Sequence, residues 1–270
     1  MINFLEINLI DAILYCLTGA FVGFAAGLLG IGGGLIIVPV LYFIFSSQNF
    51  DPQHLMHMAL ATSLATIIIT SISSTLAHHK KNAVLWPIVL LLTPGIGLGS
   101  WFGASYAAQL DTSTLKPIFG IFEIFVAFLM FSQYQSKQHQ LTIKKMNGFI
   151  GGNIIGSVSA IVGIGGGSLT VPFLHWHKIN IKNAIATSAA CGLPIAIFAT
   201  ASYIYNGWDI PSTRQNVFGF VQLDAFLLIA TSSFILAPFG AKYAHQIPSA
   251  ALKKIFSVFL LLLGLKMLLF

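Results

Sequence analysis

The chain has 270 residues, of which 56% are apolar and only 7% are charged, and its mean hydropathy is +0.87. Soluble domains carry roughly 25% charged residues to cover their surface. This composition therefore excludes a soluble globular protein and indicates an integral membrane protein. We expect an all-α polytopic fold, because a membrane barrel would alternate polar and apolar residues instead of forming long apolar runs.

Three further features exclude other classes of protein. Cys16 and Cys191 lie in apolar runs and belong to no CxxC pair, so neither a disulfide framework nor a metal site is expected. No Lys or Arg precedes Glu6, so the chain does not begin like a secretory signal peptide. The basic residues occur singly or in pairs between apolar segments, which indicates membrane topology and no nucleic-acid partner.

Eight apolar segments follow one another along the chain, and two of them are interrupted by glycine. They cover residues 9–45, 54–77, 83–108, 114–132, 147–174, 182–205, 217–241 and 250–270. The longest breaks between them, at 48–53, 133–146 and 206–216, hold most of the Gln, Asn, Asp and Pro and are expected to be loops. The first and fifth segments are long, and each contains the sequence Gly-Ile-Gly-Gly-Gly near its middle.

The two glycine clusters are copies of each other. A shift of 133 positions places Gly19, Gly23 and the first cluster on Gly152, Gly156 and the second cluster, and Val-Pro follows both clusters at the same distance. The triplet Ala-Thr-Ser recurs at a shift of 125 positions, and a Gly-x-x-Tyr-Ala-x-Gln pattern recurs at a shift of 137. The sequence therefore predicts a duplicated unit of about 135 residues, with residues 1–135 as the first repeat and 136–270 as the second.

The distribution of Lys and Arg predicts how the repeats lie in the membrane. If each glycine-broken segment crosses the membrane once, the basic residues divide almost evenly between the two sides. If each instead returns as a hairpin, ten lysines share one side and only Lys116, Arg214 and Lys266 lie on the other. The positive-inside rule favours the hairpins. We therefore expect two inverted repeats, each a glycine-broken hairpin plus three transmembrane helices, with both termini outside.

Paired glycine breaks in inverted repeats point to the central site of a transporter, because unwound backbone in a membrane must line protein or a cavity. The helix that follows each break offers a positive N-terminus to a small anion. Candidate substrate-binding residues are therefore Gly30, Gly32, Gly33 and Gly34, with Gly163, Gly165, Gly166 and Gly167. The alternative is that these glycines only allow a tight turn. The GxxxG ladders elsewhere predict close helix packing.

Other polar groups inside apolar segments are further candidates. Thr62 and Ser63 match Thr187 and Ser188, and their hydroxyls could donate to an oxyanion or bond back to their own helix carbonyls. Glu123 is surrounded by apolar residues and is a candidate for proton coupling, with a simple interhelical hydrogen bond as the alternative.

The repeated G-x-G-G-G-x(3)-V-P pattern and the Ala-Thr-Ser triplets resemble the TauE/SafE family of sulfite exporters, also called the toluene-sulfonate uptake permease group. The resemblance covers nearly the whole chain. It implies a permease of the cytoplasmic membrane for sulfite, another sulfur oxyanion or an organosulfonate, with no cofactor. The expected partners are this anion and the lipid bilayer, and a homodimer stays open. The alternatives are an intramembrane enzyme and a non-transporting assembly subunit.

Overall fold

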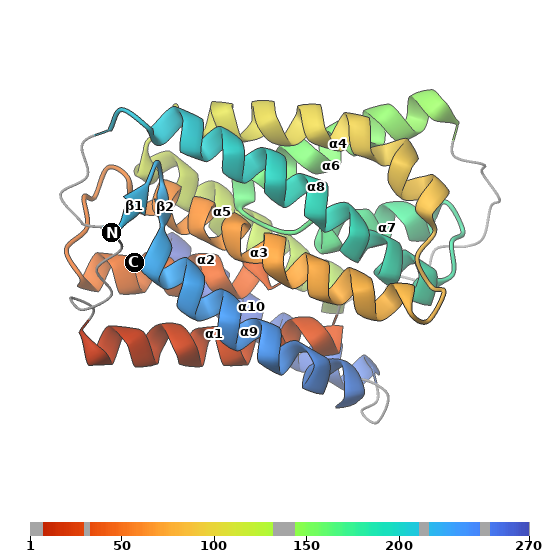
Figure 1. The fold of residues 1–270 in the computed structure, drawn as a ribbon, viewed down its shortest axis with the longest axis horizontal. Coiled ribbons are helices and arrows are strands. Elements are labelled where there is room, and N and C mark those ends of the chain that lie inside the picture. The colour runs from red at the N-terminus through yellow and green to blue at the C-terminus, as the bar shows by residue number, and fades with distance from the viewer. Residues whose placement is uncertain (1–7, 30–32, 132–143, 211–215, 244–248, 270) are drawn as a thin grey trace.

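Ten helices and one two-stranded hairpin make up the described part of the chain, which comprises residues 8–29, 33–131, 144–210, 216–243 and 249–269 of a computed structural model. In chain order they are α1 (Leu9–Leu29), α2 (Gly34–Ser47), α3 (Leu55–His79), α4 (Trp86–Ala107), α5 (Thr112–Phe131), α6 (Lys145–Val162), α7 (Gly167–Trp176), α8 (Ile181–Gly207), β1 (Val217–Phe218), β2 (Val221–Gln222), α9 (Leu223–Tyr243) and α10 (Ser249–Leu269). Figure 1 shows the helices running roughly along one long axis. The expected all-α architecture is confirmed.

Both glycine clusters fall between two helices that run in opposite directions. In Figure 1, α1 runs from left to right and α2 returns, whereas α6 runs from right to left before α7 returns. The limbs are unequal, with 21 and 14 residues in α1 and α2 and 18 and 10 in α6 and α7. At about 1.5 Å per residue, α1 is long enough to cross a hydrocarbon core of about 30 Å by itself. Each hairpin therefore combines a long helix with a short one.

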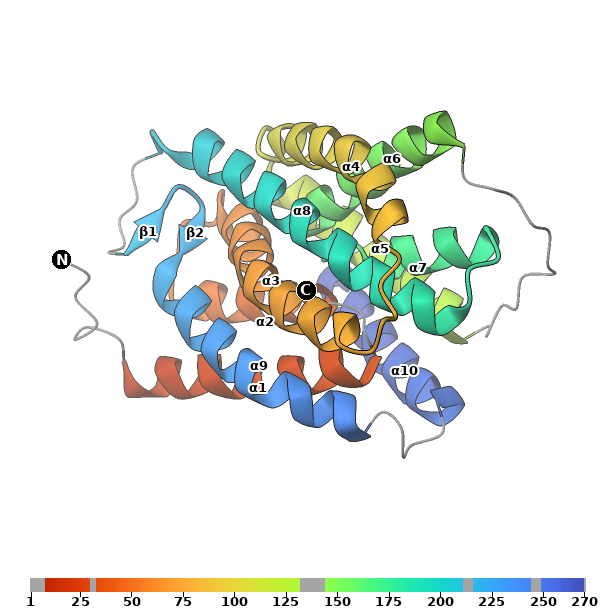
Figure 2. The same ribbon diagram turned by 45° about the vertical axis from the view of Figure 1, so that its right-hand side comes forward.

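The most extensive contacts between helices form pairs that are equivalent in the two halves of the chain. The most extensive are α4 with α6 and α1 with α9, followed by α5 with α10 and α3 with α8. Each helix of the first half has its counterpart five places further along the chain, so that α1 corresponds to α6 and α4 to α9. The α4–α6 pair therefore corresponds to the α9–α1 pair, and the α5–α10 and α3–α8 pairs each correspond to themselves. Figures 1 and 2 both show α1 lying along α9 and α4 along α6.

Glycine ladders allow these pairs to approach at backbone distance. A Cβ atom placed on Gly95 or Gly99 of α4 would lie 2.1 Å from a carbonyl oxygen of α6, that of Phe149 or Asn153. A Cβ on Gly23 of α1 would lie 2.4 Å from the carbonyl oxygen of Ser233 in α9. Because a side chain there would push the partner helix away, the packing role predicted for the ladders is confirmed.

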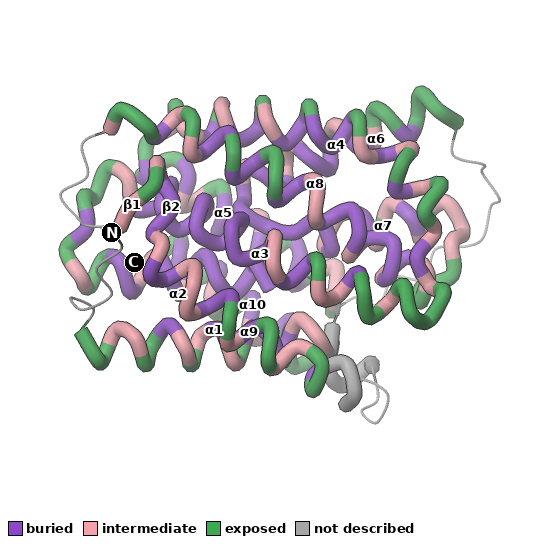
Figure 3. Tube along the Cα trace, in the orientation of Figure 1, coloured by how far each residue is buried: buried purple, intermediate pink, exposed green. Residues whose placement is uncertain are grey.

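Within the described residues, six helices are long and apolar enough to cross a membrane by length and composition: α1, α3, α4, α5, α8 and α9. The most buried of them is α3, which lies in the middle of the bundle, while α1 and α4 present exposed apolar faces (Figure 3). Apolar side chains that point outward around a buried centre are what a lipid-facing bundle requires.

One expected boundary is wrong. The apolar run 217–241 was predicted as a single helix, but its first six residues form the β1–β2 hairpin and α9 begins only at Leu223. Gly219 adopts φ 59° in the turn, a conformation that glycine accepts without strain. Val217 pairs with Gln222 and Phe218 with Val221 across the two strands, where β-branched and aromatic residues are favoured. Apolar composition alone did not distinguish this short hairpin from the start of a helix.

Candidate functional site

The two short helices α2 and α7 begin at equivalent glycines with the same backbone conformation. Gly33 precedes α2 with φ 76° and Gly166 precedes α7 with φ 70°. A left-handed conformation is strained for most residues with a side chain, and a Cβ here would also collide with Val22 or Ile195, so glycine is favoured at both positions. Gly163 ends α6 with φ 69°, a left-handed C-terminal cap. Gly30 and Gly32 lie outside the described residues.

The glycine turn before α2 contacts the glycine turn after α6. A Cβ placed on Gly34 would lie 2.6 Å from the carbonyl oxygen of Gly163 and 2.9 Å from the Cα of Ile164. The hydroxyl of Ser63 donates to the same Gly163 carbonyl at 2.9 Å. The backbone N–H of Gly167 donates to the carbonyl of Gly165 at 2.8 Å and is thus used within its own turn.

The predicted threonines join the two halves of the chain. The Thr62 hydroxyl accepts a hydrogen bond from the backbone N–H of Gln222 at 3.0 Å, just before α9. The Thr187 hydroxyl accepts from the backbone N–H of Leu85 at 3.1 Å, just before α4. Thr62 and Thr187 are equivalent at a shift of 125 positions, and Leu85 and Gln222 at a shift of 137. We call these two contacts the threonine bridges.

The predicted serines differ from each other. Ser63 reaches across to the second glycine turn, as described above, whereas the Ser188 hydroxyl donates at 2.9 Å to the carbonyl of Ile185 in its own helix. Both side chains are fully buried. Ser188 therefore follows the alternative considered from the sequence, in which the hydroxyl bonds back to its helix.

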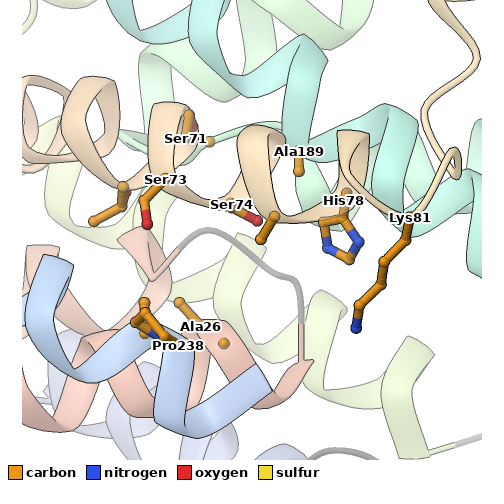
Figure 4. Close-up of a pocket in the computed structure, with 13 residues that line it drawn as sticks. Ala26, Ser71, Ser73, Ser74, His78, Lys81, Ala189 and Pro238 are labelled. Atoms are coloured by element: carbon orange, nitrogen blue, oxygen red, sulfur yellow. The ribbon is translucent and has the colours of Figure 1, made fainter. Parts of the chain in front are cut away.

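One cavity opens beside the second glycine turn, between α3, the end of α1 and α9. Thirteen residues line it: Ala26, Gly27, Thr70, Ser71, Ser73, Ser74, Ala77, His78, Lys81, Gly165, Ala189, Ala237 and Pro238. Figure 4 shows Ser71, Ser73 and Ser74 on α3, with His78 and Lys81 towards the end of that helix. The lining thus combines hydroxyl donors with a positive charge, and no acidic residue is among these thirteen. Such a lining suits a small anion.

Among the predicted site residues that the structure describes, only Gly165 lines this cavity. No prediction included the hydroxyl-rich stretch of α3, which reads Thr-Ser-Ile-Ser-Ser-Thr over residues 70–75. That stretch was a usable signal, because five hydroxyl side chains within six residues are unusual in an apolar run. It went unnoticed because it has no copy in the second half, where residues 195–200 read Ile-Ala-Ile-Phe-Ala-Thr.

Glu123 lies apart from the cavity, in the middle of α5. Its side chain is fully buried, and neither carboxyl oxygen has a hydrogen-bond partner among the described residues. The equivalent position in the second half, Leu260, is also fully buried. An acid with no polar partner in a membrane helix is expensive to keep and points to a functional role. The interhelical hydrogen bond considered as the alternative is not seen within the described part of the chain.

These features define a multi-pass helical membrane protein with a polar cavity beside paired helix breaks. Comparison with known proteins gives its family: the profile described as "Sulfite exporter TauE/SafE" matches residues 15–267, so the chain belongs to this family. A probable membrane transporter protein of Haemophilus influenzae is 39% identical over 259 residues, covering 94% of this chain and 97% of that protein. A probable membrane transporter protein of Methanocaldococcus jannaschii is 30% identical and covers 95% of both chains. No solved structure matches significantly.

Proposed function

We propose that the chain is a secondary transporter of a small anion, with sulfite, another sulfur oxyanion or an organosulfonate as the substrate class. The observation that carries this proposal is the cavity, in which serine and threonine hydroxyls of α3 lie between Lys81 and the glycine turn at Gly165. Hydroxyls donate hydrogen bonds to oxyanions, and a lysine favours negative charge. The family name and the relatives named as transporters support the same class.

The repeat architecture supports alternating access. In this proposal residues 1–135 and 136–270 are inverted repeats, which agrees with the matched helix contacts, the opposite directions of α1 and α6, and the paired threonine bridges. Transporters of this construction bind substrate where broken helices of the two repeats meet. Here that place is the contact between Gly34 and Gly163.

The binding residues proposed at this place are the two glycine clusters, with Thr62, Ser63, Thr187 and Ser188 around them. The anion would enter through the cavity, pass the α3 hydroxyls and reach the N-terminal ends of α2 and α7. Glu123 would carry the coupled proton. We further propose that the protein lies in the cytoplasmic membrane with both termini outside, which places Lys81 and the cavity mouth on the cytoplasmic side.

Uptake into proteoliposomes tests this function. The purified chain is reconstituted, and the flux of sulfite, thiosulfate, taurine and chloride is compared under an imposed pH gradient. We expect one sulfur anion to enter faster than chloride and protein-free liposomes to show neither flux. Equal, background-level flux for all four anions would contradict the proposal and favour the assembly subunit.

A further inference from the structure

The residues that line the cavity have counterparts in the other half of the chain. The repeats align α1 with α6 at a shift of 133 positions, α3 with α8 at 125, and α4 with α9 at 137. Six lining residues, Ala26, Gly27, Ala77, His78, Lys81 and Pro238, thereby correspond to Ser159, Ala160, Ser202, Tyr203, Asn206 and Trp101. Ala77, His78 and Lys81 of the first set lie at or just after the C-terminal end of α3. Their counterparts Ser202, Tyr203 and Asn206 lie at the C-terminal end of α8, and these two ends point in opposite directions in Figure 1.

Counterparts of residues that face each other across the cavity are hydrogen bonded in the second half. The Tyr203 hydroxyl donates to the carbonyl of Ala160 at 3.2 Å, where the equivalent residues are His78 and Gly27. The Ser202 hydroxyl donates to the carbonyl of Trp101 at 2.9 Å. These two bonds tie α8 to α6 and to α4, whereas the corresponding residues of α3, α1 and α9 line the cavity.

The two sets of residues also differ in how far they are buried. Ser159, Ala160, Ser202 and Tyr203 are all 0% exposed. Their counterparts are more accessible, since Ala77 is exposed and Ala26, Gly27 and His78 are half-buried.

Further contacts reinforce the closed side. The ring of Phe220, in the β1–β2 turn, packs edge-on against Tyr203 with ring centroids 6.3 Å apart. The Asn206 amide donates to the Ser202 carbonyl at 2.8 Å and to the Ser105 hydroxyl at 3.3 Å. The side chains of α8 are therefore buried and in contact with their neighbours where the corresponding side chains of α3 line the cavity.

We propose that Tyr203 and Ser202 form the closed gate of a second access path, which lies between α4, α6 and α8 and leads to the end of the bundle opposite the cavity. This inference rests on the proposed inverted repeats and transport. A transporter needs one path closed while the other is open, and inverted repeats achieve this by exchanging conformations around a fixed site. Opening the gate breaks the Tyr203–Ala160 and Ser202–Trp101 hydrogen bonds, and α3 then closes on α1 and α9.

Sided thiol labelling tests the gate. Both native cysteines are removed by Cys16→Ser and Cys191→Ala, and a single reporter is introduced as Ala26→Cys in the cavity or Ser159→Cys at its counterpart. The membrane-impermeant reagent 2-sulfonatoethyl methanethiosulfonate is applied to one side of the membrane at a time. We expect Ala26→Cys to react from the cavity side only, and Ser159→Cys to react from the opposite side about tenfold more slowly, the factor that one to two net hydrogen bonds provide.

Replacing Tyr203 and Ser202 by the residues found at their counterparts, His78 and Ala77, should open the gate. The double change Tyr203→His and Ser202→Ala is expected to accelerate labelling of Ser159→Cys from the opposite side and to slow labelling of Ala26→Cys. If this variant does not fold, Tyr203→Phe removes only the hydroxyl and should accelerate Ser159→Cys by about fivefold, the factor of a single hydrogen bond. Tyr205→Phe, on the exposed face of α8, is the matched control and should change neither rate.

Equal rates for the two reporters behind an intact gate, or no acceleration by either Tyr203 variant, would overturn the gate. Labelling requires no anion flux, so its result is separate from that of the transport assay. A protein that opens as expected but moves no anion would retain the gate and lose the proposed function. A protein that transports sulfite while both reporters react equally would retain the proposed function and lose the gate.

Discussion

Lys81 and the hydroxyls of α3 set which ligands the cavity accepts. Hydroxyl groups can donate or accept and do not select a charge by themselves. Lys81 supplies the positive charge, and in the partly solvated mouth of a cavity a charge acts over several ångströms. Lys80 carries the same charge one residue earlier but does not line the cavity. Lys80 is therefore a natural control for the effect of the Lys81 charge on the cavity.

Lys81→Gln should raise the KM for the transported anion by about fivefold, because two unit charges about 4 Å apart in water interact by ~1 kcal/mol. Lys80→Gln should leave the KM nearly unchanged. Initial rates of uptake into proteoliposomes, measured at constant ionic strength, give both values. An equal change in the two variants would reduce Lys81 to a contributor of general surface potential.

Glu123→Gln should abolish uptake driven by a pH gradient while leaving exchange of anion for anion largely intact, because the amide keeps the shape of the side chain and carries no exchangeable acid proton. Glu123→Leu, which copies Leu260 from the second half, should give the same transport defect in a folded protein. The two fluxes are measured on the same proteoliposome preparation. Unchanged pH-driven uptake in both variants would make Glu123 a packing residue.

At the level of the elements, the threonine bridges fix where α4 and α9 begin. The first N–H groups of a helix have no partner within the helix and need one from elsewhere. For α4 and α9 a threonine from the other half of the chain supplies part of that need, so each bridge joins the start of one helix to the N-terminal part of another. The two halves of the chain are therefore linked by hydrogen bonds as well as by the glycine ladders.

Thr62→Val and Thr187→Val should each lower the stability of the protein by about 1–2 kcal/mol, because each leaves a backbone N–H without its partner. The two losses should be similar, since the contacts are equivalent. Thr66→Val is the control, because the Thr66 hydroxyl only donates to the Thr62 carbonyl within its own helix. Thermal unfolding in detergent measures all three. A loss for Thr66→Val as large as the others would contradict a special role for the bridges.

The glycine hairpins and ladders could be predicted because their geometry demands glycine, which leaves a mark in the sequence and in its repeat. Gly33 and Gly166 need a left-handed backbone, and Gly99 needs contact with another backbone. The threonine bridges were not predicted, since the N–H of Gln222 binds Thr62 from 160 positions away and any residue except proline could supply that N–H. The cavity was missed for a related reason, because its α3 hydroxyls lie in only one repeat.

In the whole molecule, the two ends of the helical bundle differ in how many lysines they carry. Lys80, Lys81, Lys144, Lys178 and Lys182 lie at or near the helix ends on the right of Figure 1, the end where α3 finishes and α8 begins. Lys116 and Lys266 lie towards the other end, against the rings of Tyr42 and Phe43 near the end of α2. α1 begins and α10 finishes at this second end in Figure 1. An excess of lysine marks the cytoplasmic side of a membrane protein.

Topology reporters should therefore divide between the two sides of the membrane. Alkaline phosphatase, which is active only outside the cytoplasm, should be active when fused after Phe270, and green fluorescent protein should fluoresce when inserted between Gln138 and Gln140. The physical reason is that each glycine hairpin adds a return, so that the linker between the repeats lies opposite the C-terminus. If both reporters act on the same side, the inverted arrangement of the repeats is wrong, and with it the assignment of the cavity mouth at Lys81 to the cytoplasm.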